Sequence, residues 1–197
     1  MAVPVSFLPP STLIARVEAL ATNSPIPAAA GVYGWWFRTV PPPIEASGCS
    51  QFDGLTLLYV GIAPKAPASN GRPPSSQTLR SRVRYHFRGN AEGSTLRKTL
   101  GVLLGSGLGI ELRRVGSGKR MTFGQSGEQS LSDWLACNAL VSWVEHQRPW
   151  ELERDLFAAL DLPLNLSDNS HSGFHGTLKA LRAAAVARAR ELPVLGS

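Results

Sequence analysis

A carboxylate at position 153 lies on the inward face of its own predicted helix. The apolar spacing i, i+3, i+4 and i+7 aligns Glu153 with Leu156, Phe157 and Leu160. Burying an ionised carboxylate without a partner costs on the order of several kcal/mol, so such a group must be neutralised, paired or metal-bound. Two interpretations of Glu153 stay open: a buried ion pair with an arginine such as Arg82, and a site for a hard metal ion.

Two tyrosines occur in glycine-flanked segments that are rich in β-branched and aromatic residues. The first segment is Gly31-Val32-Tyr33 and the second is Tyr59-Val60-Gly61. Both segments are typical of strands. Each tyrosine could pack in a sheet with a satisfied hydroxyl, or present its phenol oxygen to a reaction.

These tripeptides and the motifs that follow them resemble the GIY-YIG nuclease domain, with some likeness to its restriction-enzyme branch. After GVY and YVG, the segment LRSRVRYHF resembles the family's basic helix, whose arginine matches Arg82. The segment LERDLFAALDLPLN resembles the glutamate helix and the Pro-x-Asn that follows it, matching Glu153, Pro163 and Asn165. The resemblance covers residues 31–165, within an expected single domain of 1–197 whose segments 1–30 and 166–197 are helical extensions.

The resemblance implies a metal-dependent DNA endonuclease that hydrolyses phosphodiester bonds. The implied catalytic residues are Tyr33, Tyr59, Arg82, His86, Glu153 and Asn165. Glu153 would hold Mg²⁺ or Mn²⁺, and Arg82 would bind the phosphoryl oxygens. Tyr33 matches the candidate general base, although a free phenol with a pKa near ~10 suits that role poorly at pH 7.

The remaining implied roles concern positioning. Tyr59 and His86 would position water or phosphate, with His86 one helical turn after Arg82. Asn165 would orient the glutamate helix or make a backbone contact. His86 could equally be a packed core histidine.

One position departs from the family pattern. Many members carry a lysine directly after YIG, whereas Ile62 occupies that place and the nearest basic side chain is Lys65. A catalytically impaired nucleic-acid-binding module is therefore the alternative function. A third hypothesis is an interaction domain held by an Arg–Glu pair, without a nucleic-acid role.

The positive charge is concentrated in the first half of the chain. The net charge is +6, and residues 72–98 alone hold seven cations against Glu92. Clustered like charge favours a polyanionic partner, although a solvated helix face is equally compatible. The predicted DNA-binding residues are Lys65, Arg72, Arg80, Arg84, Arg88, Arg97 and Lys98.

The pattern of elements predicts an α+β fold, a small sheet flanked by helices, which the resemblance makes antiparallel. The expected helices cover 11–22, 79–87, 95–104, 131–137, 149–160 and 173–192. The expected strands cover 31–40, 55–62 and 138–146, with a hairpin formed by 110–115 and 120–123. Ser11, Thr78 and Ser94 are the expected N-caps of the first three helices. The inner stripe of the last helix is predicted to be Phe174, Leu178, Leu181 and Ala185.

Compartment and membrane signals are few. No apolar run reaches the roughly 18 residues of a membrane span, and no signal peptide is recognisable. Cys49 and Cys137 lie far apart without a CxxC motif, so neither a disulfide framework nor a zinc ribbon is expected. We expect a cytoplasmic protein without a membrane partner.

Overall fold

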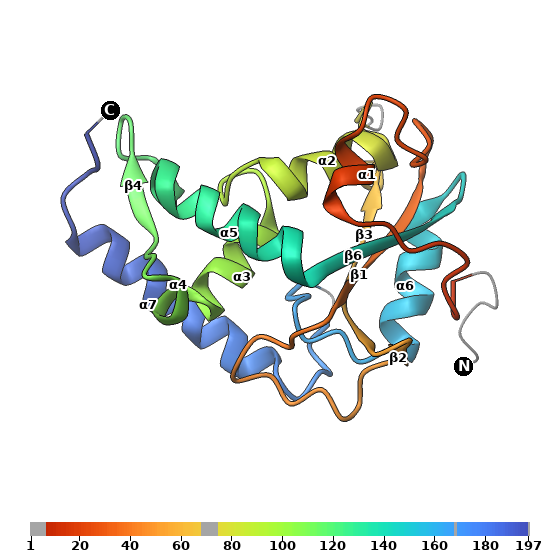
Figure 1. Ribbon diagram of the computed structural model, residues 1–197. Coiled ribbons are helices and arrows are strands. Elements are labelled where there is room, and N and C mark those ends of the chain that lie inside the picture. Colours follow the sequence, from red (N-terminus) through yellow and green to blue (C-terminus); the bar gives the residue numbers. More distant parts are fainter. Residues whose placement is uncertain (1–6, 68–74, 168, 197) are drawn as a thin grey trace.

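The computed structural model describes residues 7–67, 75–167 and 169–196 and has an α+β fold. A four-stranded antiparallel sheet has the order β2-β3-β1-β6 (Figure 1). Its strands are β1 (Gly31–Phe37), β2 (Gln51–Phe52), β3 (Leu55–Ala63) and β6 (Ala139–Glu145). A separate two-stranded hairpin pairs β4 (Arg113–Val115) with β5 (Arg120–Thr122). The predicted fold class is confirmed.

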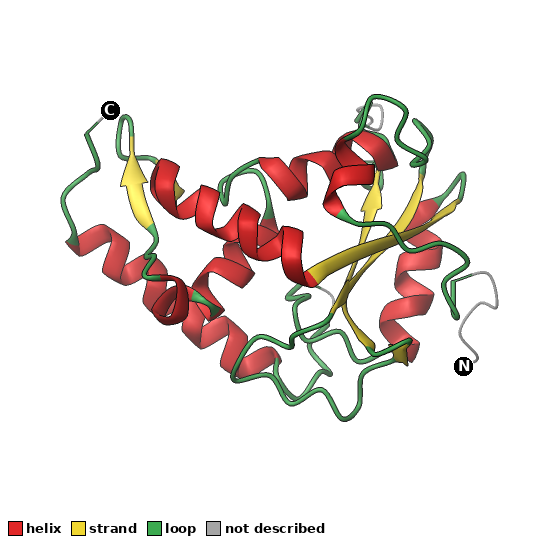
Figure 2. Ribbon diagram, viewed as in Figure 1, coloured by secondary structure: helices red, strands yellow, loops and turns green. Residues whose placement is uncertain are grey.

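Helices cover both faces of the sheet (Figure 2). The helices are α1 (Arg16–Leu20), α2 (Leu79–Arg88), α3 (Thr95–Leu103), α4 (Gly105–Leu108), α5 (Gly124–Asn138), α6 (Pro149–Ala159) and α7 (His175–Glu191). On β1, Val32 and Trp36 join the core under α6, whereas Tyr33 and Trp35 join the core under α2 and α5. All seven residues of β1 are consequently buried.

Two predicted helix starts are confirmed by their capping bonds. Thr78 accepts from the backbone N–H of Ser81, and Ser94 accepts from that of Arg97. The buried stripe of α2 is the predicted one, Leu79, Val83, His86 and Phe87. These caps set the residues at which α2 and α3 begin.

The first predicted helix was too long. Only Arg16–Leu20 is helical and Ala15 is its N-cap, so Ser11 does not cap it. Ile14 instead pairs in an extended conformation with Val141 of β6, and Val17 is 76% exposed. Sheet pairing displaced the helix that the apolar spacing predicted.

Three further differences concern polar or glycine-containing segments. Strand β2 lies where a loop was expected, joined to β3 by Asp53 and Gly54, both with positive φ. Helix α5 begins seven residues before the predicted 131–137 segment. Leu181 is 36% exposed, so it does not belong to the inner stripe of α7. No helix in the described ranges is long and apolar enough to cross a membrane.

Candidate active site

A cavity of about 420 Å³ lies where β1, β3, α2 and α6 meet. Five of the six predicted catalytic residues line it: Tyr33, Tyr59, Arg82, Glu153 and Asn165. Ile62 and Lys65 also line this cavity. Two strands, two helices and the segment after α6 thus bring together residues that are up to 132 positions apart in the sequence.

The GVY and YVG segments face each other across the sheet. Tyr33 pairs with Gly61 in the antiparallel register of β1 and β3. The ring of Tyr33 lies over Gly61, because a Cβ at position 61 would come 2.5 Å from the Tyr33 hydroxyl oxygen. Because Gly61 has no side chain, it leaves room for the Tyr33 ring to reach the cavity.

His86 lies behind Tyr33 and does not line the cavity. Its Nε2 is 2.8 Å from the Tyr33 hydroxyl and its Nδ1 is 2.7 Å from Ser94 Oγ, in a completely buried position. Burial, with the charges of Arg82 and Arg97, holds the pKa of His86 well below its ordinary value. Because both ring nitrogens have protein partners, His86 reaches the cavity through Tyr33, and its predicted role in positioning water or phosphate stays a prediction.

Both tyrosines are neutral phenols at rest. Burial raises the pKa of Tyr33 well above its ordinary value, with Tyr59 and Glu153 adding to the effect and Arg82 opposing it. Burial also raises the pKa of Tyr59 to about 12, again with Arg82 opposing and Glu153 adding. Glu153 therefore lies close enough for its negative charge to act on both hydroxyls.

Glu153 faces the cavity from α6. Trp150, Glu153 and Phe157 all line it, as the i, i+3 and i+7 spacing on one helix face requires. Leu156 and Phe157 are buried as predicted, whereas Glu153 is half-buried at the edge of that face. A half-buried carboxylate beside an open volume can keep contact with water, which a fully buried one cannot.

The residues present fit a magnesium-type ion. Mg²⁺ keeps several water ligands and binds one or two carboxylates together with substrate phosphates. Glu153 is the only acidic residue among the described residues that line the cavity. No group of three or more His, Cys, Asp or Glu side chains in the described ranges forms an all-protein metal cage. This donor set suits a metal held by one carboxylate, water and phosphate, and it does not suit a structural zinc site.

Arg82, Asn165 and Lys65 complete the cavity wall. Arg82 donates from Nη1 to the carbonyl oxygen of Gly93 at 2.9 Å. The side-chain amide of Asn165 bonds both backbone groups of Val60, accepting at 2.9 Å and donating at 2.7 Å. Asn165 thus fastens the segment after α6 to β3, which is the backbone contact predicted for it. Lys65 is exposed at the rim.

The family model of the GIY-YIG catalytic domain matches residues 31–184 of this chain. The chain belongs to the GIY-YIG nuclease family. No curated protein and no solved structure matches it significantly. The matched range includes the first half of α7, beyond the 31–165 segment that carries the sequence motifs.

Among the predicted DNA-binding residues of this GIY-YIG chain, Arg97 is misassigned. Its side chain is 0% exposed and forms an ion pair with Glu128 at 2.8 Å. The guanidinium also donates to the carbonyl oxygens of His86 and Phe87 and to Ser132 Oγ. Arg97 therefore joins α2, α3 and α5 and cannot reach a nucleic acid.

Two further arginines of that set are bound to backbone carbonyls. Arg80 donates from Nε to Ile26 at 2.6 Å. Arg84 donates from Nε to Ala19 at 3.0 Å and from Nη2 to Ala21, which caps the end of α1. Both side chains are half-buried, so they hold α2 against the N-terminal segment. The DNA contacts predicted for Arg80 and Arg84 stay predictions, to be made by the N–H donors that these bonds leave over.

The other predicted cations differ in placement. Arg88 is exposed and Lys98 is half-buried, whereas Arg72 lies outside the described residues. The motifs did not identify Arg182 of α7, whose charge acts on the hydroxyl of Tyr59. No sequence signal relates these two residues, because they are 123 positions apart.

Proposed function

We propose that this protein is a divalent-metal-dependent DNA endonuclease that hydrolyses phosphodiester bonds. The observation that carries the proposal is the convergence of Tyr33, Arg82 and Glu153 on one cavity of nucleotide-compatible size. Membership of the GIY-YIG family indicates nuclease activity in general. The metal requirement and the choice of DNA are our inference from the chemistry of the cavity.

In the proposed reaction, Tyr33 receives a proton from the attacking water. As the water oxygen bonds to phosphorus, Tyr33 passes its own proton to Nε2 of His86; the leaving oxygen departs with the electron pair of the broken P–O bond and takes a proton from solvent. The 2.8 Å separation between these two atoms permits that transfer. Ser94 Oγ, which already accepts from the backbone N–H of Arg97, has a second lone pair for Nδ1–H of His86. This arrangement holds His86 in the tautomer that leaves Nε2 open as an acceptor.

The lowered pKa of His86 keeps its imidazole neutral before the reaction. A histidine that is neutral at pH 7 is available to receive a proton, whereas an imidazolium is not. The pKa of Tyr33 is raised, so its hydroxyl proton does not leave unless another base accepts it. We therefore assign His86 as a positioning residue and proton acceptor that acts through Tyr33.

Cations in the cavity would stabilise charge at phosphorus. Arg82 would bind the phosphoryl oxygens, and Lys65 would supply the ammonium that many family members place directly after YIG. Glu153 would hold the metal ion, which supplies Lewis-acid stabilisation of the developing negative charge when bound. Asn165 keeps β3 and the segment after α6 in register around these groups.

The test is cleavage of supercoiled plasmid in Mg²⁺ or Mn²⁺, with EDTA as the blank. We expect metal-dependent nicking or linearisation by the natural protein and its loss in Glu153→Gln, because the amide keeps the shape but not the charge. Glu151→Gln is the matched control, since Glu151 is on the same helix but pairs with Arg148 away from the cavity. Full cleavage by Glu153→Gln would remove Glu153 from the metal-binding role.

The second candidate is a GIY-YIG module that binds nucleic acid without cleaving it. The observation that favours it is Ile62, an apolar residue in the cavity wall where many members carry lysine. Duplex binding in EDTA without cleavage in either metal would select this candidate. Loss of cleavage in Lys65→Ala would instead show that Lys65 takes the role of the lysine that many members carry directly after YIG.

A further inference from the structure

A second concentration of positive charge lies on α7 and the β4–β5 hairpin. Together, residues 175–191 and 113–122 hold eight Lys and Arg but one acid, Glu191. Their net charge is +7, whereas residues 72–98 hold +6. In that basic stretch Arg80, Arg84 and Arg97 are bound within the protein, so α7 and the hairpin offer a polyanion a second surface.

The first half of α7 is close to the catalytic cavity. Leu178 is buried, and Arg182 one turn later is half-buried and donates to Thr99 Oγ1 of α3 at 3.3 Å. The charge of Arg182 also lowers the pKa of Tyr59, a cavity residue. A polyanion lying on α7 would therefore pass next to the reacting site.

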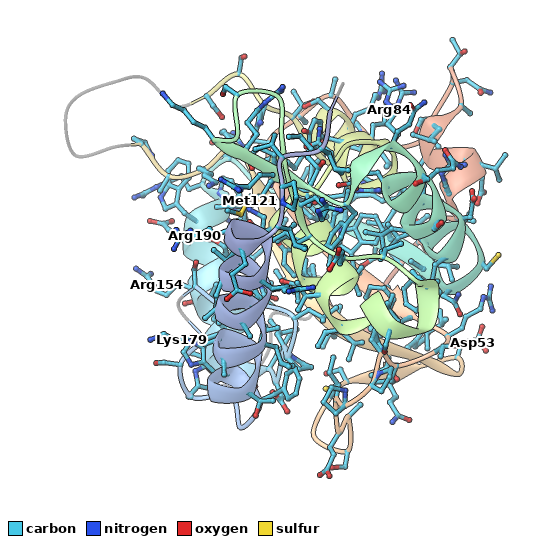
Figure 3. The ribbon with its side chains drawn as sticks, turned by 90° about the vertical axis from the view of Figure 1, so that its left-hand side faces the viewer. Asp53, Arg84, Met121, Arg154, Lys179 and Arg190 are labelled. Carbon is cyan, nitrogen blue, oxygen red and sulfur yellow. The ribbon has the colours of Figure 1, made fainter. Side chains whose placement is uncertain are left out.

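Two exposed cations mark one side of α7. Lys179 and Arg190 are eleven residues apart, which is close to three full turns and about 16 Å along the helix axis. Ala183, one turn after Lys179 on that side, is exposed and small enough to let another molecule approach. Figure 3 shows Lys179, Arg190 and Arg154 of α6 pointing to the same side of the molecule.

The hairpin extends this surface beyond the end of α7. Arg114 of β4 donates to the carbonyl oxygens of Ala189 and Leu192, at 3.2 and 2.8 Å. The backbone N–H of Leu195 donates to the carbonyl oxygen of Arg114 at 2.9 Å. These bonds fix the hairpin against the C-terminal end of α7 (Figure 1). Lys119 is exposed at the hairpin turn.

We propose that the exposed face of α7, marked by Lys179 and Arg190 and continued by Lys119, holds the duplex beside the bond to be cut. We call this surface the α7 track. The inference rests on the proposed function. The seventeen residues of α7 span about 25 Å, or roughly seven base pairs of B-form duplex. The contacts would be made to phosphates, so the α7 track binds duplex DNA without reading its sequence.

The experiment measures duplex affinity in a background that cannot cut. The Glu153→Gln protein is titrated against a fluorescent 24-base-pair DNA duplex in EDTA at several salt concentrations. Lys179→Gln with Arg190→Gln should weaken binding at least tenfold and reduce the slope of log K against log salt by up to about 1.8. The matched control is Arg38→Gln with Arg148→Gln, two exposed cations outside α7 and the hairpin, which should leave affinity and slope unchanged.

The outcomes separate this inference from the function on which it rests. An unchanged slope in the α7 double variant would overturn the α7 track. Tighter binding of an RNA duplex of the same sequence would overturn DNA as the occupant. No duplex binding by the Glu153→Gln protein would overturn the proposed function itself. All four substitutions are at exposed positions, and thermal melting of each variant verifies that it folds.

Discussion

Replacing Arg97 by methionine should destabilise the protein strongly, because its guanidinium is the centre of a buried polar cluster. Six hydrogen bonds leave this side chain, three of them to the carboxylate and carbonyl oxygens of Glu128. Two others reach the carbonyl oxygens of His86 and Phe87, which belong to the last turn of α2 and lack helical partners. Methionine has a similar length, so the loss is mainly of polar contacts.

The expected magnitude follows from the burial of the pair. Glu128 has a side chain 12% exposed, and the loss of Arg97 leaves its charge without an opposite partner. Removing one member of a buried pair costs about 3–5 kcal/mol, a large part of a total stability of about 5–15 kcal/mol. We expect the urea midpoint of Arg97→Met to fall accordingly, with little change in the denaturant slope.

A second variant distinguishes unpaired charge from lost packing. Glu128→Gln in the Arg97→Met background removes the negative charge but keeps an oxygen that can accept from the backbone N–H groups of Ala91 and Phe123. This double variant should recover part of the loss, giving a non-additive double-mutant cycle. A loss below about 1 kcal/mol for Arg97→Met would refute the structural role. If the Arg97→Met protein folds and its slope of log K against log salt for DNA binding is reduced, Arg97 contacts DNA after all.

Two further predictions concern the surroundings of Tyr33. Gly61→Ala should reduce cleavage about a hundredfold, because its Cβ would displace the Tyr33 hydroxyl from the reacting position. Gly107→Ala is the control and should cleave normally, since a Cβ at position 107 has nothing within 4 Å. Normal cleavage by Gly61→Ala would contradict the close approach of Tyr33 to Gly61. His86 should make folding pH-dependent: its folded pKa is lowered while its unfolded pKa stays near 6.5, so its contribution is present above pH 6.5 and is lost as the pH falls. Between pH 7.5 and 5.5 the free energy of unfolding should fall by about 1.4 kcal/mol more in the natural protein than in His86→Asn, measured by urea unfolding, and equal falls would be inconsistent with a neutral buried imidazole.

The sequence predicted the elements whose signals are local. Thr78 and Ser94 precede regular apolar spacing, and both begin helices that carry the expected side chains inward. The 11–22 segment shows similar spacing, but Ile14 pairs with a strand residue more than 120 positions away. Such long-range pairing leaves no trace in a short window. Asp53-Gly54 was a usable turn signal for β2, since Asp-Gly favours tight hairpins.

The helix-face argument that we used for Glu153 also predicts the burial of Arg97. Arg97, Leu100 and Leu104 are spaced i, i+3 and i+7, so the arginine shares the inward face of α3. Its counter-charge, Glu128, is 31 positions away on α5 and is not identifiable from spacing. Counting charge along the sequence therefore assigned Arg97 to the surface, although the fold buries it.

The basic stretch of the sequence supports the site from behind. Hydrogen bonds connect Glu128 to Arg97, the backbone N–H of Arg97 to Ser94, Ser94 to His86, and His86 to Tyr33 in the cavity wall. The charges of Arg82 and Arg97 lower the pKa of His86, which favours the neutral imidazole that the proposed proton transfer requires. A cation that is buried near a base thus keeps that base unprotonated before the reaction, and an exposed cation contributes by attracting phosphate. In this chain α3 carries a cation of the first kind and α7 carries those of the second, although the two helices pack against each other.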